Sequence, residues 1–146
     1  MRYEIILHNQ HANQQLDFVA FDDAIEAAPT PIAPNIPAGG VGAARVRVKS
    51  VPGNPVVPIV GGGGHPGGTI YYSRTDANGL RFYKISIFPP VAGGFVAIQR
   101  CAATGAVPNP HTGNYQAYRN VFLPTGPKLA VSKFVHAGVV RVSMTI

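Results

Sequence analysis

The sequence predicts an all-β fold, a single antiparallel β-sandwich or jelly-roll-like domain of about eight strands over residues 1–146. All 14 prolines follow residue 28, and a proline inside a helix costs about 3 kcal/mol. Long helices are therefore excluded from most of the chain. The segments between the prolines are rich in Val, Ile, Tyr, Phe and Thr, with alternating polarity typical of strands. The length suits one domain with a substantial core.

The first strand is expected over residues 2–9, where Tyr3, Ile5 and Leu7 share one side. Residues 16–21 fit either a strand or a helix, because their periodicity favours neither. At most one short helix is expected, near residues 22–28. There the acidic pair in Asp-Ala-Ile-Glu resembles the first turn of a helix.

Two long segments, 29–44 and 51–68, are rich in proline and glycine and are expected to be extended. Between and after them, alternating polarity predicts the remaining strands. Asn78 and Gly79 supply the backbone conformation that a tight hairpin needs. The strands are expected at residues 45–49, 69–75, 80–88, 95–100, 119–123, 129–136 and 140–146. The final strand has one apolar face, formed by Val140, Val142, Met144 and Ile146.

The formal net charge of +6 is unevenly distributed. Residues 1–26 carry one arginine and five acids, whereas residues 27–146 carry 11 basic residues and one acid, Asp76. Three interpretations remain open. The acidic start could fold back over the basic body, it could dock on the basic surface of another copy, or the basic body could bind a polyanion. Specific nucleic-acid binding is not expected, because the basic residues are scattered and form no recognition pattern.

The composition argues against an enzyme, and no catalytic, cofactor-binding or metal-binding residue is predicted. Past residue 26 the only carboxylate is Asp76, in the expected hairpin turn, so paired-carboxylate and two-metal chemistry lack their acids. The glycine-rich segment 61–68 leads into a strand and lacks the Lys-Ser/Thr of a phosphate-binding loop. His8 and His11 are expected to be separate surface residues. Cys101, the one cysteine, is expected to be buried at a strand end.

Two groups of residues are the candidate contact sites. The first is the basic cluster at one strand, and the second is the loop 108–115 with the tyrosines near it. Because neighbours in a strand face opposite ways, we expect some tyrosine among Tyr71, Tyr72, Tyr115 and Tyr118 to be exposed. The candidate binding residues are Arg45, Arg47, Lys49, His111, Asn114, Tyr115 and Tyr118.

The chain is expected to open with a strand at Tyr3–Asn9 and to continue to a central hairpin that runs from Gly68-Thr69 to Pro89-Pro90. This order of elements resembles that of small membrane-lesion β-sandwiches, the actinoporin-like and aegerolysin-like toxins. The resemblance covers about half of the chain and implies contact with a membrane surface. The sequence departs from that pattern because it contains no tryptophan and no amphipathic N-terminal segment. Membership is therefore not claimed.

The sequence thus predicts a non-catalytic structural protein, a small subunit or decorating protein of a virion-type capsid or tail. Its partners would be copies of itself or other subunits of the assembly. The alternative is a β-sandwich module that binds an anionic glycan or lipid, as a lectin or a membrane-damaging toxin would. No signal peptide or transmembrane segment is expected, since the uncharged stretch 51–73 carries four prolines and seven glycines. We expect synthesis in the cytoplasm, then incorporation in a virion or release without a cleaved leader.

Overall fold

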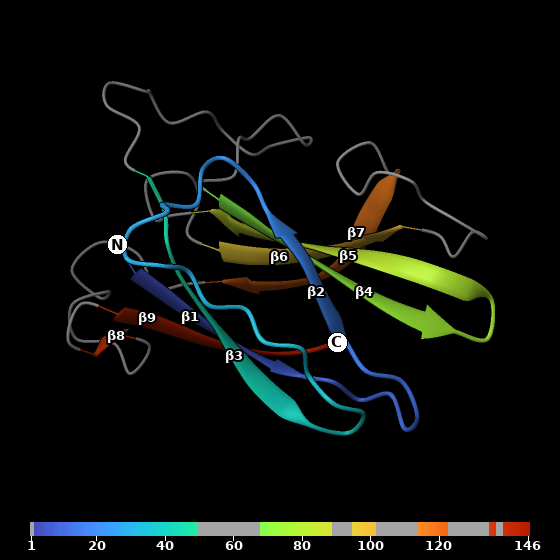
Figure 1. Ribbon diagram of the computed structural model, residues 1–146. Helices are drawn as coiled ribbons and strands as arrows, with labels where there is room; N and C mark the ends of the chain where they lie inside the picture. Colours follow the sequence, from blue (N-terminus) through green and yellow to red (C-terminus); the bar gives the residue numbers. More distant parts are fainter. Residues whose placement is uncertain (1, 50–67, 89–94, 102–113, 123–134, 137–138) are drawn as a thin grey trace.

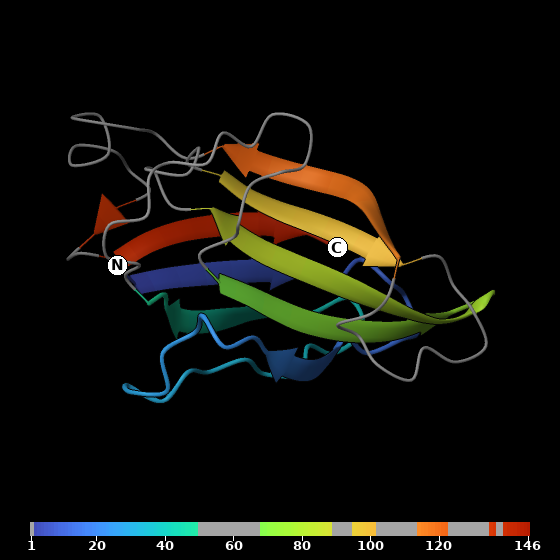
Figure 2. The same cartoon turned by 90° about the horizontal axis from the view of Figure 1, so that it is seen from above.

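A computed structural model describes residues 2–49, 68–88, 95–101, 114–122, 135–136 and 139–146. These residues form nine strands in two sheets that stack face to face (Figures 1 and 2). No helix occurs among them, and hence none long and apolar enough to cross a membrane. The predicted all-β sandwich is confirmed.

The smaller sheet has the strand order β3-β1-β9-β8. It consists of β1 (Arg2–His8), β3 (Val41–Arg47), β8 (Val135–His136) and β9 (Val139–Thr145). β3 and β8 lie antiparallel to their neighbours, but β1 and β9 are parallel. This departs from the all-antiparallel expectation. A parallel pair needs a long connection, and here the chain passes through the whole second sheet between β1 and β9.

The larger sheet has the order β2-β4-β5-β6-β7 and is antiparallel throughout. Its strands are β2 (Asp17–Phe21), β4 (Gly68–Asp76), β5 (Gly79–Phe88), β6 (Phe95–Cys101) and β7 (Tyr115–Phe122). The last four follow each other as an up-and-down meander. The segment 16–21, which the sequence left open between helix and strand, is therefore mainly strand.

The predicted hairpin joins β4 and β5, with Asp76 opposite Gly79. Gly79 has a φ of 116°, which disfavours any residue with a Cβ. The carboxylate of Asp76 accepts a hydrogen bond from the amide of Asn78 at 2.8 Å and pairs with Arg81 at 2.9 Å. The single acid of the basic body thus closes a turn and stabilises it locally.

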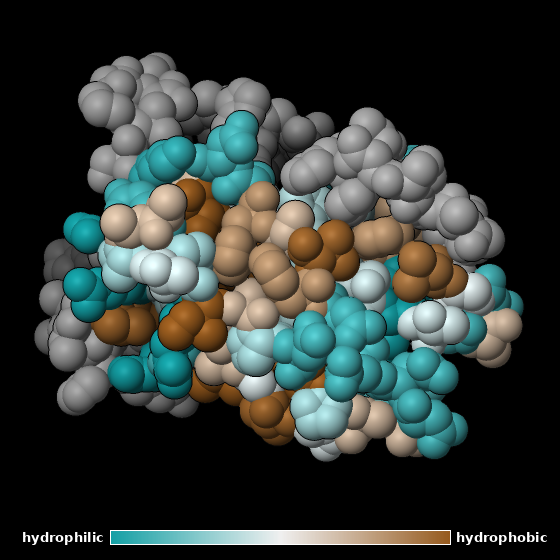
Figure 3. Space-filling model, in the orientation of Figure 1, coloured by the Kyte–Doolittle hydropathy of each residue, from teal (hydrophilic) through white to brown (hydrophobic). Residues whose placement is uncertain are grey.

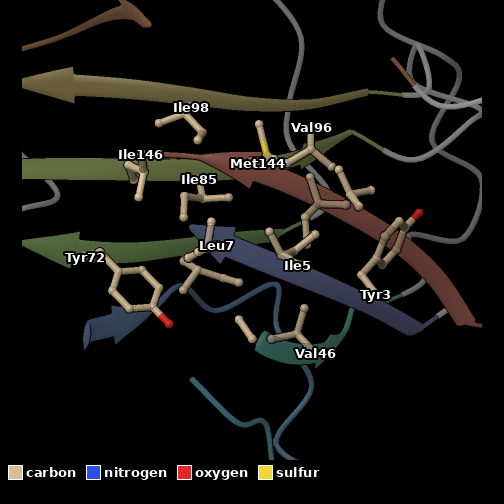
Figure 4. Packing of buried hydrophobic residues seen from close by; sticks show 14 of the residues in the cluster. Tyr3, Ile5, Leu7, Val46, Tyr72, Ile85, Val96, Ile98, Met144 and Ile146 are labelled. Carbon is tan, nitrogen blue, oxygen red and sulfur yellow. The ribbon is translucent and has the colours of Figure 1, made fainter. Parts of the chain in front are cut away.

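The core lies between the sheets and is built by side-chain alternation. Figure 4 shows Ile5 and Leu7 of β1 lying close to Ile85 of β5 across this interface. Burying one such aliphatic side chain contributes about 1.5–3 kcal/mol. The core cluster consists of Tyr3, Ile5, Leu7, Leu16, Ile25, Ile36, Ala44, Val46, Val48, Ile70, Tyr72, Tyr83, Ile85, Ile87, Val96, Ile98, Val140, Val142, Met144 and Ile146.

The short helix allowed near residues 22–28 does not form. Oδ1 of Asp22 accepts a hydrogen bond from the amide of Ala24, which makes a tight turn instead of a helical one. Ile25 then pairs with Val48 in an isolated β-bridge, and its side chain enters the core. The burial of Ile25 therefore outweighs the helical signal of the two acidic residues around it.

The strand expected at 45–49 instead spans Val41–Arg47, so part of the segment 29–44 is a regular strand. Gly42 permits this close packing, because a Cβ there would lie only 2.8 Å from Cγ1 of the fully buried Ile36. The expected strand at 119–123 begins earlier, at Tyr115. Of the expected strand 129–136, only β8 lies within the described residues, and the segment 51–67 lies outside them.

Candidate functional site

The outer face of the smaller sheet gathers arginines from three strands. In β1, Tyr3, Ile5 and Leu7 point into the core, so Arg2 and Glu4 face outward. Arg45 and Arg47 of β3 are the direct partners of Glu4 and Arg2, and Arg141 of β9 is the partner of Glu4 on the other side. Strand pairing therefore places Arg2, Arg45, Arg47 and Arg141 around a single central carboxylate.

Glu4 holds two of these arginines. Nε of Arg45 lies 3.0 Å from Oε2 of Glu4, and Nε of Arg141 lies 3.4 Å from Oε1. The hydrogen bond from Arg45, helped by the charges of both arginines, holds the pKa of Glu4 below its usual value. Glu4 therefore stays ionised, and it orients two guanidinium groups at the sheet surface.

The row formed by Arg2 and Arg47, which are partners across β1 and β3, is less well neutralised than the row around Glu4. Nε of Arg47 lies 3.4 Å from Oε2 of Glu26. Its cross-strand partner Arg2 is exposed and makes no ion pair with any described residue. Like charges directly opposite each other in a sheet are destabilising. This row therefore carries an excess of positive charge.

These residues line a groove of about 250 Å³, here called the arginine groove. One wall is the segment beside β3, where the main chain of Ile32 exchanges hydrogen bonds of 2.9 and 2.7 Å with Arg45. Hydrophobic and hydrophilic residues are interleaved on the face seen in Figure 3. The groove is lined by Arg2, Tyr3, Glu4, Pro29, Thr30, Ile32, Arg45, Val46, Arg47, Val139 and Arg141.

Of the predicted binding residues that the structure describes, Arg45 and Arg47 line the arginine groove and the others do not. Lys49, next along the chain, instead donates a hydrogen bond from Nζ to the carbonyl of Asp23. His111 lies outside the described residues. Asn114, exposed just before β7, belongs with the other sheet.

Tyr115 and Tyr118 also lie in the larger sheet and are half-buried. The Tyr118 ring packs against the core and lies under the guanidinium carbon of Arg100, 4.5 Å from the ring centre. Tyr115 is the cross-strand partner of Cys101, and burial raises its pKa. These tyrosines do not line the arginine groove.

The expectation of an exposed tyrosine is wrong for Tyr71 and Tyr72, which lie in the middle of β4. Tyr71 and Tyr72 do face opposite ways, as strand geometry requires, yet Tyr71 is 5% exposed and Tyr72 is fully buried. Both faces of this part of the larger sheet are therefore covered.

Sequence reasoning missed Arg2, Glu4 and Arg141 as members of the site. Alternation alone places each of them on the polar side of its strand. The missing information was which strands are neighbours, because Glu4 and Arg141 are 137 positions apart in the chain.

His8, His11 and Cys101 are each held in place by contacts within the fold. Nε2 of His8 is hydrogen-bonded to Ser143, whereas Nδ1 of His11 accepts hydrogen bonds from the amides of Asn13 and Gln14. Cys101 is buried, as expected, at the end of β6. No group of three potential metal ligands occurs in the part of the chain that the structure describes.

Comparison with protein-family models, curated proteins and solved structures finds no match to this chain. The resemblance to membrane-lesion toxins has no matching family or structure to support it.

Proposed function

We propose that this protein is a non-catalytic β-sandwich subunit that assembles with copies of itself, as subunits of virion-type capsids or tails do. The outer face of the smaller sheet is the proposed contact surface. One observation carries the proposal: this face combines four arginines with the two large hydrophobic side chains that stand exposed among the described residues.

Those two side chains are Ile32, 49% exposed, and Val41, 57% exposed. Val41 begins β3, and Ile32 is bridged to Arg45 near its other end. The cores of protein–protein interfaces are apolar and enriched in arginine. The apolar and cationic groups along β3 match that composition.

Ion pairs within the chain reduce the acidic charge that the first 26 residues could offer to another copy. Glu4 and Glu26, two of the five acids in residues 1–26, pair with arginines of the same chain. These pairs support the interpretation in which the acidic start folds back over the basic body. We therefore assign the contact between copies mainly to apolar burial along β3, with a smaller contribution from salt-sensitive pairs.

Light scattering over a range of protein concentrations tests this proposal. The wild-type mass should rise with concentration, and the variant Ile32→Ser with Val41→Ser should remain monomeric. A matched control is Ala117→Ser, at an exposed position on β7 of the other sheet. A wild-type chain that stays monomeric at every concentration would disprove self-assembly.

The alternative proposal is binding of an anionic glycan or lipid. The arginines of the outer face favour it, since cationic surfaces attract anionic headgroups. Its expected support from exposed tyrosines is weaker, because Tyr71 and Tyr72 are both buried.

A further inference from the structure

We infer that the arginine groove is a binding site for a phosphate monoester carried on a short aliphatic stem. This inference does not depend on assembly, because it concerns the chemistry of the groove in a single copy. Four observations lead to it: unbalanced charge, unused donors, the net charge of the lining and the nature of the walls.

The charge is unbalanced where Arg2 faces Arg47. These two residues are direct partners on β1 and β3, and only Arg47 has a carboxylate beside it in the described residues. A bound anion at this row would relieve the repulsion between the two guanidinium groups. The folded chain therefore gains most from an anion at this end of the groove.

The arginines also have unused donors. Arg45, Arg47 and Arg141 each use Nε for their carboxylate. Within the described residues, no hydrogen bond is formed by their Nη atoms. Guanidinium groups present paired N–H donors that match the oxygens of phosphate and carboxylate. The existing pairs restrain these side chains while leaving donors for a ligand.

The net charge favours a dianion over a single carboxylate. Four arginines and one glutamate line the groove, which leaves a formal charge of +3, and Glu26 beside Arg47 reduces this local excess to +2. Glu4 already occupies the place between Arg45 and Arg141. A phosphate monoester carries a charge of about −1.5 to −2 at neutral pH and offers three acceptor oxygens. It compensates the remaining excess better than a carboxylate would.

The walls indicate what carries the phosphate. Pro29, Ile32 and Val139 supply aliphatic surface beside the arginines. The aromatic residue of the lining, Tyr3, is 1% exposed, so its ring offers no stacking platform for a sugar or a base. An aliphatic stem therefore fits these walls better than a sugar or nucleoside.

Calorimetric titration with inorganic phosphate and with n-butyl phosphate tests the site, with chloride used to hold the ionic strength constant. The titrations are made at a dilution where light scattering gives a monomer. We expect saturable one-to-one binding, with butyl phosphate about tenfold tighter because its stem is partly buried. Absence of saturable binding by butyl phosphate would overturn the inference.

Variants locate the binding. Arg2→Gln and Arg47→Gln should each weaken both ligands about tenfold, since each removes a charged hydrogen-bond donor. Ile32→Ser should weaken butyl phosphate while leaving inorganic phosphate unchanged. The control Arg119→Gln removes an equal charge from the exposed surface of β7. Equal weakening by Arg119→Gln would show that only general electrostatics is involved and would refute the site.

A vesicle assay identifies the source of the phosphate. If vesicles containing phosphatidic acid bind the wild-type chain but not Arg47→Gln, the ligand is a lipid headgroup. If they do not bind but butyl phosphate does, the ligand is a soluble ester. Val41→Ser separates this inference from assembly, because Val41 does not line the groove. That variant should change the mass at high concentration and leave phosphate binding intact.

Discussion

Glu4 and Arg45 are direct partners across β1 and β3, and Nε of Arg45 lies 3.0 Å from Oε2 of Glu4. The other oxygen of the same carboxylate lies 3.4 Å from Nε of Arg141 on β9. One side chain of a central strand therefore connects three strands on the outer face of the sheet. It also sets the orientation of two guanidinium groups in the arginine groove.

The first prediction concerns pH. The pKa of Glu4 is lowered in the folded chain, so its contribution to stability is present above the unfolded pKa and is lost as the pH falls through the folded value. Glu4→Gln should lower the free energy of unfolding at neutral pH by no more than about 1 kcal/mol, because both arginine partners of Glu4 are exposed to solvent. The difference from wild type should shrink at about pH 3.

Urea unfolding at both pH values measures this difference. The control Asp23→Asn removes an exposed carboxylate that makes no ion pair with a described residue. If the two variants behave alike, the ion pairs of Glu4 contribute nothing specific.

The second prediction tests which way β1 faces. Leu7 is fully buried between the sheets, whereas its neighbour Ile6 points to the other side and is half-buried. Leu7→Ala should cost about 2–5 kcal/mol of unfolding free energy, through lost burial and the cavity left behind. Ile6→Ala should cost clearly less. Equal losses in thermal or urea unfolding would contradict the observed register.

The third prediction concerns Arg74 of β4, whose guanidinium group joins distant parts of the chain. Nη1 donates to Oδ1 of Asn9 at 2.8 Å and to the main-chain oxygen of Ile146 at 3.0 Å, while Nη2 donates to the hydroxyl of Tyr83 at 2.9 Å. Arg74→Lys keeps the charge but cannot reproduce this planar set of donors. We expect a loss of about 1–3 kcal/mol in urea unfolding.

The matched control for Arg74 is Arg119→Lys on the exposed surface of β7, where the guanidinium carbon lies 5.0 Å from the centre of the Tyr118 ring. This control should cost no more than about 1 kcal/mol, the size of an exposed cation–π contact. An equally small loss for Arg74→Lys would mean that its hydrogen bonds add little net stability.

The fourth prediction concerns thiol reactivity. Cys101 is 3% exposed, and burial raises the pKa of its thiol. The thiolate is the reactive form, so a thiol reagent at neutral pH should label the native chain far more slowly than the urea-unfolded chain. Equally fast labelling in both states would contradict the burial of Cys101.

The strands predicted most accurately are those whose own sequence shows two different faces. The alternation that ends in Val142, Met144 and Ile146 predicts β9 with few errors, and Asn78-Gly79 identifies the hairpin. The start of β3 is missed because Gly42, Ala43 and Ala44 have no preference for strands. Pairing with β1 overrides that weak local signal.

The candidate site was harder to predict than the fold. Arg45 and Arg47 are recognisable as a local basic cluster, but Arg2 and Arg141 join them only through the pairing of β1 with two strands distant in sequence. Tyr115 was assigned to a recognition loop because its neighbours are loop-forming residues. In the structure it begins β7 and lies beside Cys101.

The parallel pairing of β1 with β9 has a kinetic consequence. Neighbouring segments of the chain can form the meander β4–β7 early, whereas the pairing of β1 with β9 must wait for a segment more than a hundred residues away. Pulse-labelling hydrogen exchange during refolding should therefore protect the amide of Ile85 before that of Val142. Until β9 arrives, one side of β1 remains an open edge that a foreign strand could occupy, so misassembly should compete with folding at this edge.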